Sequence, residues 1–216
     1  MEEALRYSTI LMAGIMIGAV YWTGKKRKES VCLEEKRTKL YFYGIFPALL
    51  FLSFYLILSP AQIEVTAMWK RICIAAVLWP VAYVDFKKHL IPNTYLLLAL
   101  GCRVVIFLVE VLQSPMNGLA QLISEIIGSL VLLAFCLLMR LLSRKGLGMG
   151  DVKLFAVLPL FLGALGGMRA LLYAMILIFI QSCFCLITKR KGKKDVLPFA
   201  PAIEAGVWIV ILLSGI

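Results

Sequence analysis

Eight apolar runs, separated by short polar or glycine-rich segments, constrain the fold of this chain more than any other feature. A helix of about 20 apolar residues spans the hydrocarbon core of a bilayer. Of the 216 residues, 62% are hydrophobic and 16% are charged, whereas a soluble domain is about 45–50% apolar and about 25% charged. We therefore predict an all-α, polytopic integral membrane protein with a single membrane-embedded domain over residues 1–216. The expected spans are 7–22, 41–59, 69–84, 91–112, 119–139, 152–165, 168–187 and 198–215.

The sixth span differs from the others in length and composition. Residues 152–165 are too few to cross a bilayer upright, and Pro159 lies inside the run. Proline in a helix interior removes a backbone hydrogen bond and kinks or breaks the helix. We expect this span to be short, tilted or broken, and we expect Gly166-Gly167 to turn the chain into the next span.

The net charge of +11 is compatible with a nucleic-acid partner, but the positions of the charges indicate a bilayer instead. If the N-terminus lies outside, alternate loops lie inside, and those loops hold eighteen of the 23 Lys and Arg residues. This asymmetry matches the positive-inside rule. The short basic loops at 24–39 and 188–197 are therefore predicted to be cytoplasmic. We predict a multi-pass protein of the cytoplasmic (inner) membrane that binds no nucleic acid.

Arg103 and Glu125 are charged residues well inside two neighbouring predicted spans. Arg103 is in the middle of the fourth span, and Glu125 is at a comparable depth in the fifth, toward the outer side. A charge inside the membrane usually pairs with another charge. Our hypothesis is that Arg103 and Glu125 form an ion pair.

Two aspartates lie at the ends of apolar spans. Asp85 ends the third span, and Asp151 precedes the sixth, behind Gly148 and Gly150. Alternating orientation places both at cytoplasmic helix ends, at similar depth, so the two carboxylates can meet. Glycines let the backbone approach a partner closely. Each aspartate also has an ordinary interpretation, Asp151 as a helix N-cap and Asp85 as an interfacial charge.

Two facing carboxyl groups can hydrolyse a peptide bond if one is ionised and the other protonated. Two unit charges about 4 Å apart repel by about 4 kcal/mol at an effective dielectric constant of 20, so such a pair shares one proton and titrates as a unit. The residues alone do not say which aspartate is the acid. The sequence lacks the residues for a zinc or a Ser-His hydrolytic site. His89 is the only histidine, no H-E-x-x-H occurs and the six cysteines form no C-x-x-C pair. We expect neither a metal ion nor a cofactor.

Three segments resemble motifs of one group of membrane proteases. GMGDVKL at 148–154 resembles the GxGD signature of the intramembrane aspartic proteases. DFKKHLIPN at 85–93 is similar to the first aspartate motif of the type IV prepilin peptidases. LPFAP at 197–201 is similar to that family's later PFGP motif, with Ala200 where the family has glycine. The resemblance covers roughly residues 70–206.

The resemblance implies a GxGD aspartic protease fold with Asp85 and Asp151 as the catalytic pair. Five further motif residues are then expected to support the pair: Gly148, Gly150, Lys153, Pro92 and Asn93. The family cuts the short basic leader from prepilins and pilin-like precursors at the cytoplasmic face, just before the hydrophobic helix of the substrate. Many members also methylate the new N-terminus and carry paired C-x-x-C motifs in a cytoplasmic loop. Loop 24–39 has only Cys32, so we expect a peptidase without N-methyltransferase activity.

A proton- or cation-coupled transporter is the alternative function. Aspartates at a membrane edge, a broken helix and glycines also suit that class of protein. A proton relay is expected to place carboxylates along the membrane depth, whereas Asp85 and Asp151 share one face and only Glu125 and Glu204 could continue such a path. This arrangement favours hydrolysis. Glu204, about one turn inside the last span, is a further candidate to face the aspartate pair.

Overall fold

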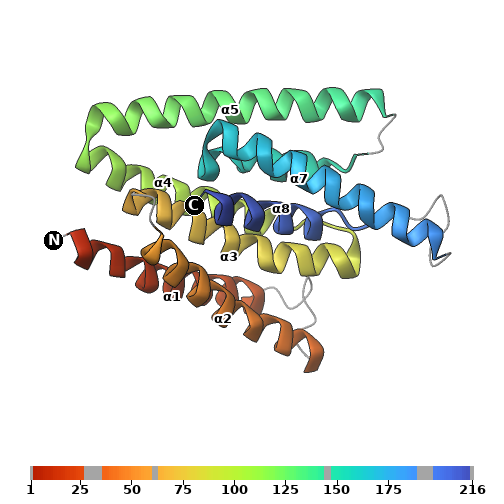
Figure 1. Cartoon of the computed structure of the whole chain (residues 1–216), viewed down its shortest axis with the longest axis horizontal. Coiled ribbons are helices and arrows are strands. Elements are labelled where there is room, and N and C mark those ends of the chain that lie inside the picture. Colours follow the sequence, from red (N-terminus) through yellow and green to blue (C-terminus); the bar gives the residue numbers. More distant parts are fainter. Residues whose placement is uncertain (1, 27–35, 60–62, 144–146, 189–196, 215–216) are drawn as a thin grey trace.

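A computed structural model of the chain consists of helices joined by short connections (Figure 1). It describes all residues except 1, 27–35, 60–62, 144–146, 189–196 and 215–216. In this described part there are eight helices and no strand. The helices are α1 (Glu2–Lys26), α2 (Lys36–Leu58), α3 (Val65–Lys88), α4 (Asn93–Gln113), α5 (Pro115–Leu142), α6 (Met149–Val157), α7 (Pro159–Ile187) and α8 (Ala200–Leu213).

The prediction of an all-α, polytopic membrane protein is confirmed. By length and composition, α3, α4, α5 and α7 can each cross a membrane, and α1, α2 and α8 contain shorter apolar segments. Several helices extend a few residues beyond the predicted runs, because an apolar run marks the part of a helix inside the bilayer rather than its ends. The C-terminal ends of α1, α3, α5 and α7 point to the same side of the bundle, toward the right in Figure 1, as alternating orientation requires.

Helix α3 is the centre of the bundle. It contacts α1, α2, α4, α7 and α8, and in Figure 1 it lies between the α1–α2 pair and the layer that contains α5. Most of its residues from Thr66 to Asp85 are buried. A helix that is apolar on nearly every side belongs in the interior of a fold. Lys70 lies near one end of α3 and Asp85 near the other, so this helix connects two charged regions of the molecule.

The predicted sixth span is broken, as expected, but the break is not where the glycine pair suggested. Helix α6 ends at Val157 and α7 begins at Pro159, and Gly163 has φ 75° and ψ 167°, a conformation that favours glycine. The turn predicted at Gly166-Gly167 is wrong, because both residues are helical. A Cβ atom on Gly167 would lie 2.7 Å from the Pro159 ring. Close packing against Pro159 therefore explains this glycine, and the non-helical backbone is at Gly163.

Candidate active site

Asp85 lies in the last turn of α3, with 6% of its surface exposed. The C-cap of this helix is His89, which has a left-handed conformation (φ 50°) and donates its backbone N–H to the carbonyl oxygen of Asp85 at 2.8 Å. Such a cap ends a helix and redirects the chain. Pro92 is the N-cap of α4, which begins at Asn93. The segment 85–93 therefore forms the tight connection between two helices and fixes Asp85 at a helix end.

Asp151 lies in the first turn of α6, whose N-cap is Gly148. The Asp151 carboxylate accepts a hydrogen bond from the Gly148 backbone N–H, as acidic side chains at the third helical position often do. The N-cap interpretation of Asp151 is therefore wrong, because Gly148 occupies that position. A Cβ atom on Gly148 would lie 2.7 Å from Oδ2 of Asp151, and one on Gly150 would lie 3.0 Å from Cβ of Ile91. The two glycines thus let the carboxylate fold over the helix end and let α6 pack against the α3–α4 connection.

The carboxyl groups of Asp85 and Asp151 are near each other. The pKa of Asp151 is raised to about 6, first by burial and then by repulsion from Asp85, while the Gly148 hydrogen bond acts in the opposite direction. A like charge shifts a carboxyl pKa in this way only at short range. Within the described residues, no three His, Cys, Asp or Glu side chains are grouped so that they could hold a metal ion.

A third segment reaches the pair through its backbone. Ala200 begins α8, and its N–H donates to Oδ2 of Asp85 at 2.9 Å in a buried hydrogen bond. The first N–H groups of a helix have no partner within the helix and carry partial positive charge, so they suit a carboxylate. The preceding residue, Phe199, packs on Phe155 of α6 with the ring centroids 5.5 Å apart. The LPFAP segment therefore contacts both aspartate-bearing helices, and Ala200 makes its contact without a side chain.

Lys153 and Asn93 connect the two aspartate motifs at the exposed edge of this region. Nζ of Lys153 donates to Oδ1 of Asn93 at 3.4 Å, and both side chains are exposed. A hydrogen bond of this length is weak. Pro92 is buried beside them. The structure thus gathers the residues of both predicted motifs at one end of the bundle.

A second group of charges lies toward the other end of α3. Lys70, Arg103, Glu110 and Glu125, here called the buried ion cluster, have side chains that are 2–4% exposed. Nζ of Lys70 is 2.9 Å from Glu110 and 2.7 Å from Glu125. The Arg103 guanidinium is 3.0 Å from Glu110 and 2.5 Å from Glu125. The predicted pairing of Arg103 with Glu125 is confirmed, and the sequence analysis missed Lys70 and Glu110.

The buried ion cluster joins three helices and carries no net charge. Lys70 comes from α3, Arg103 and Glu110 from α4, and Glu125 from α5, while Nε of Arg103 also donates to the carbonyl oxygen of Leu160 in α7 at 2.8 Å. The contacts of Glu110 are ion pairs by distance but lack the angles of hydrogen bonds. Glu110 follows Arg103 by two helical turns, and this spacing on one face was the signal available in the sequence.

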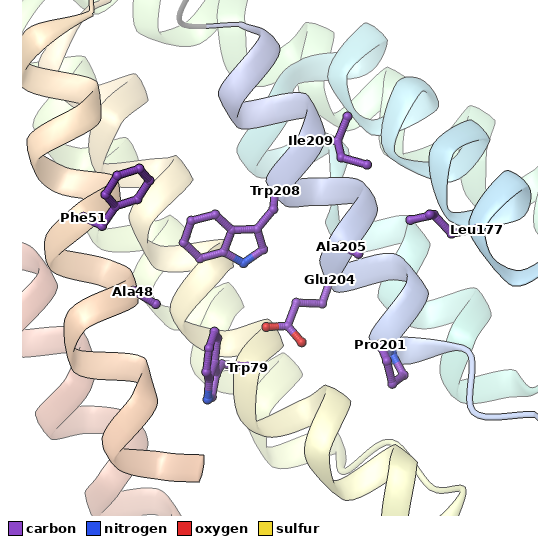
Figure 2. Close-up of a pocket in the computed structure, with 9 residues that line it drawn as sticks. All are labelled: Ala48, Phe51, Trp79, Leu177, Pro201, Glu204, Ala205, Trp208 and Ile209. Atoms are coloured by element: carbon purple, nitrogen blue, oxygen red, sulfur yellow. The ribbon is translucent and has the colours of Figure 1, made fainter. Parts of the chain in front are cut away.

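Glu204 lies one turn beyond Ala200 on α8. The sequence analysis suggested that Glu204 faces the aspartate pair. In the structure, its carboxylate points into a groove of about 570 Å³ between α2, α3, α7 and α8 (Figure 2). The groove is lined by Ala48, Phe51, Trp79, Leu177, Pro201, Glu204, Ala205, Trp208 and Ile209.

Comparison with known proteins agrees with the motifs at this end of the bundle. The type IV leader peptidase family matches residues 72–188. A curated relative, the prepilin leader peptidase/N-methyltransferase of Bacillus subtilis (strain 168), is 32% identical over 126 residues, which are 58% of this chain and 48% of the relative. The chain thus spans about half the length of this relative. No solved structure matches. The matched region includes Asp85, Asp151, most of α3 and all of α6, and the chain belongs to the type IV leader peptidase family.

Proposed function

We propose that this chain is a membrane aspartic endopeptidase that cleaves the basic leader from type IV prepilins or pilin-like precursors. The observation that carries the proposal is that Asp85 and Asp151, from the end of α3 and the start of α6, lie near each other beside the Ala200 N–H that bonds Asp85. A carboxyl pair that shares one proton can act as base and acid in the same reaction. Membership of a leader peptidase family, and a relative named as a prepilin leader peptidase, support this type of substrate.

In the proposed reaction, the ionised carboxylate takes a proton from water while the water oxygen attacks the carbonyl carbon of the peptide bond. The protonated carboxyl group gives its proton to the carbonyl oxygen, and a gem-diol forms. The carboxyl group that took the proton from water gives it to the amide nitrogen, and the other carboxylate takes a proton from a gem-diol hydroxyl group as the C–N bond breaks. The pair is then left with one shared proton, as at the start. The products are a carboxylic acid on the leader and an amine on the following segment.

The surroundings of the two aspartates favour different roles. Asp151 suits the acid, because its pKa is raised. Asp85 suits the base, because the Ala200 N–H at the amino end of α8 stabilises a negatively charged oxygen.

We place the reaction at the cytoplasmic face of the inner membrane. Asp85 and Asp151 lie at helix ends next to loops that the charge asymmetry assigns to the inside. A substrate with a water-exposed basic leader and an apolar helix presents the junction between them at this depth.

We also propose that the chain lacks N-methyltransferase activity. Loop 24–39 carries a single cysteine, Cys32, and no C-x-x-C motif. Residues 27–35 of this loop lie outside the described part of the chain.

A cleavage assay on the full chain in liposomes tests the proposal. Wild type, Asp85→Asn and Asp151→Asn are incubated with a prepilin-like substrate, with and without a metal chelator, and the shortened product is detected by mass spectrometry. Asparagine keeps the size of the side chain and removes its proton transfer, so we expect cleavage by the wild type only, unaffected by the chelator. Glu64→Gln, at the exposed start of α3, is the matched control and should cleave normally. Cleavage by either Asp variant at the wild-type rate would show that the pair is not the catalytic site.

A further inference from the structure

The groove beside α8 has no part in the proposed chemical steps. Glu204 is the one charged side chain among the 9 residues that line it, and its walls include Phe51, Trp79 and Trp208 (Figure 2). Phe51 is 60% exposed, so the groove opens to the surface of the bundle. A carboxylate is costly to desolvate in apolar surroundings, and this cost is offset by an occupant that offers positive charge or N–H groups.

The groove begins one residue beyond the backbone contact of Asp85. Pro201 lines it and directly follows Ala200, whose N–H is bonded to Asp85. Ala200 and Glu204 are four residues apart on one helix, so they share a face and are separated by about 6 Å along the axis. Trp79 precedes Asp85 by six residues, or about 9 Å along α3. The groove therefore extends along α8 from Pro201 to Ile209, about 12 Å along the helix axis and away from Ala200.

A peptide with its scissile bond at the pair would place its following residues along this groove. About two residues of extended chain cover 6 Å, so Glu204 faces the start of the segment after the cleaved bond. In the substrate class proposed above, that segment is an apolar helix. The first N–H groups of a helix lack partners within it, and its amino end carries partial positive charge. Cleavage adds a full charge, because the released amine takes up a proton and becomes a terminal ammonium group.

We propose that this groove binds the amino-terminal end of the apolar segment released by cleavage, and that Glu204 pairs with its ammonium and first-turn N–H groups. The aromatic walls then receive the first apolar side chains, so the groove selects for residues after the cleaved bond. This proposal rests on the proposed function. The basic leader lies on the other side of the scissile bond, toward water, and Glu204 is not placed to bind it.

A binding experiment with product peptides tests this role without requiring cleavage. Two synthetic apolar peptides that match the start of a pilin-like mature segment are used, one with a free N-terminus and one N-acetylated. Their affinities for the full chain in nanodiscs are measured for wild type, Glu204→Gln and the control Glu64→Gln. We expect the free amine to bind wild type and Glu64→Gln about tenfold more tightly than the acetylated peptide, because a hydrogen bond to a charged group contributes this much. In Glu204→Gln, the two peptides should bind alike.

A second variant tests the groove independently of its charge. Ala48→Leu narrows the groove from the α2 side and should weaken binding of both peptides while the preference for the free amine remains. Equal binding of the two peptides to wild type, as expected if the groove holds only lipid acyl chains, would overturn the proposal. A preference for the free amine that persists in Glu204→Gln would overturn it as well. Loss of cleavage in Asp85→Asn together with equal peptide binding would reject this inference alone, whereas cleavage by Asp85→Asn would reject the proposed function and, with it, the position of the scissile bond on which this inference rests.

Discussion

The two charged regions along α3 differ in the signs of the charges that they bring together. At one end, Asp85 and Asp151 bring two like charges together, and backbone N–H groups of Gly148 and Ala200 contact them. At the other end, the buried ion cluster pairs two cations with two anions through their own side chains. Lys70 and Asp85 are fifteen residues apart, or about 22 Å along the helix, so the two regions are separate.

This difference separates charge that holds helices together from charge that can do chemistry. In the buried ion cluster every charge is neutralised by a neighbour, which ties α3, α4 and α5 together. Replacing such a cluster as a whole by apolar residues is often tolerated, whereas removing one member leaves a buried charge without a partner. In the proposed mechanism the two aspartates share one proton, and that proton is what acid–base catalysis needs.

The largest expected effect comes from removing a proton-transfer group of the pair. Asp85→Asn or Asp151→Asn should reduce the rate of leader cleavage by about 10²–10⁴-fold, the usual contribution of general acid–base catalysis. The melting temperature should change little, because asparagine retains the size of aspartate. Cleavage rate and thermal unfolding are measured on the same preparations. If a variant loses activity because it unfolds, the aspartates stabilise the fold, as the buried ion cluster does, and their catalytic role is not supported.

Breaking the buried ion cluster should have the reverse outcome. Glu125→Ala should lower the free energy of unfolding by about 3–5 kcal/mol, because it leaves Lys70 and Arg103 buried with one carboxylate between them. The fraction that remains folded should still cleave substrate. Adding Arg103→Ala should cost less than the sum of the two single variants, as a double-mutant cycle in denaturant can measure. Simple additivity would show that Arg103 and Glu125 do not interact.

A smaller effect is expected from adding one methyl group beside the pair. Gly148→Ala places a Cβ atom 2.7 Å from Oδ2 of Asp151, so the carboxylate must move, and we expect about a tenfold loss of kcat/KM. Gly101→Ala is the matched control, because nothing lies within 4 Å of its added Cβ atom. Equal activity of the two variants would mean that the position of the Asp151 carboxylate is not critical.

The smallest effect is a pH dependence. The pKa of Asp151 is raised to about 6 by burial and by Asp85, above its unfolded value near 4. The stabilisation of its neutral form is therefore complete below pH 4 and is lost as the pH rises through about 6. Because the reaction needs the shared proton, kcat/KM should fall about fivefold between pH 6 and pH 7. A profile that is flat from pH 5 to pH 8 would contradict the shared-proton mechanism.

Sequence reasoning found the aspartate pair because helix orientation alternates regardless of how the helices pack. The same reasoning paired Arg103 with Glu125 from their depth alone. It wrongly placed a turn at Gly166-Gly167, because Gly163, Gly166 and Gly167 are the same residue type and packing decides which of them leaves the helix. It missed Lys70, since the helix-to-helix contacts that bury this residue cannot be read from a linear pattern.

The hydrogen bond from Ala200 to Asp85 has a consequence for how this segment can change over time. Every amino acid except proline supplies a backbone N–H, so a small residue other than alanine can occupy position 200 and keep the bond. Pro198 and Pro201 stand on either side, and the N–H survives at the one place where it is needed. The amino-acid sequence of the LPFAP segment can therefore change at position 200 while the backbone N–H that contacts the carboxylate stays the same.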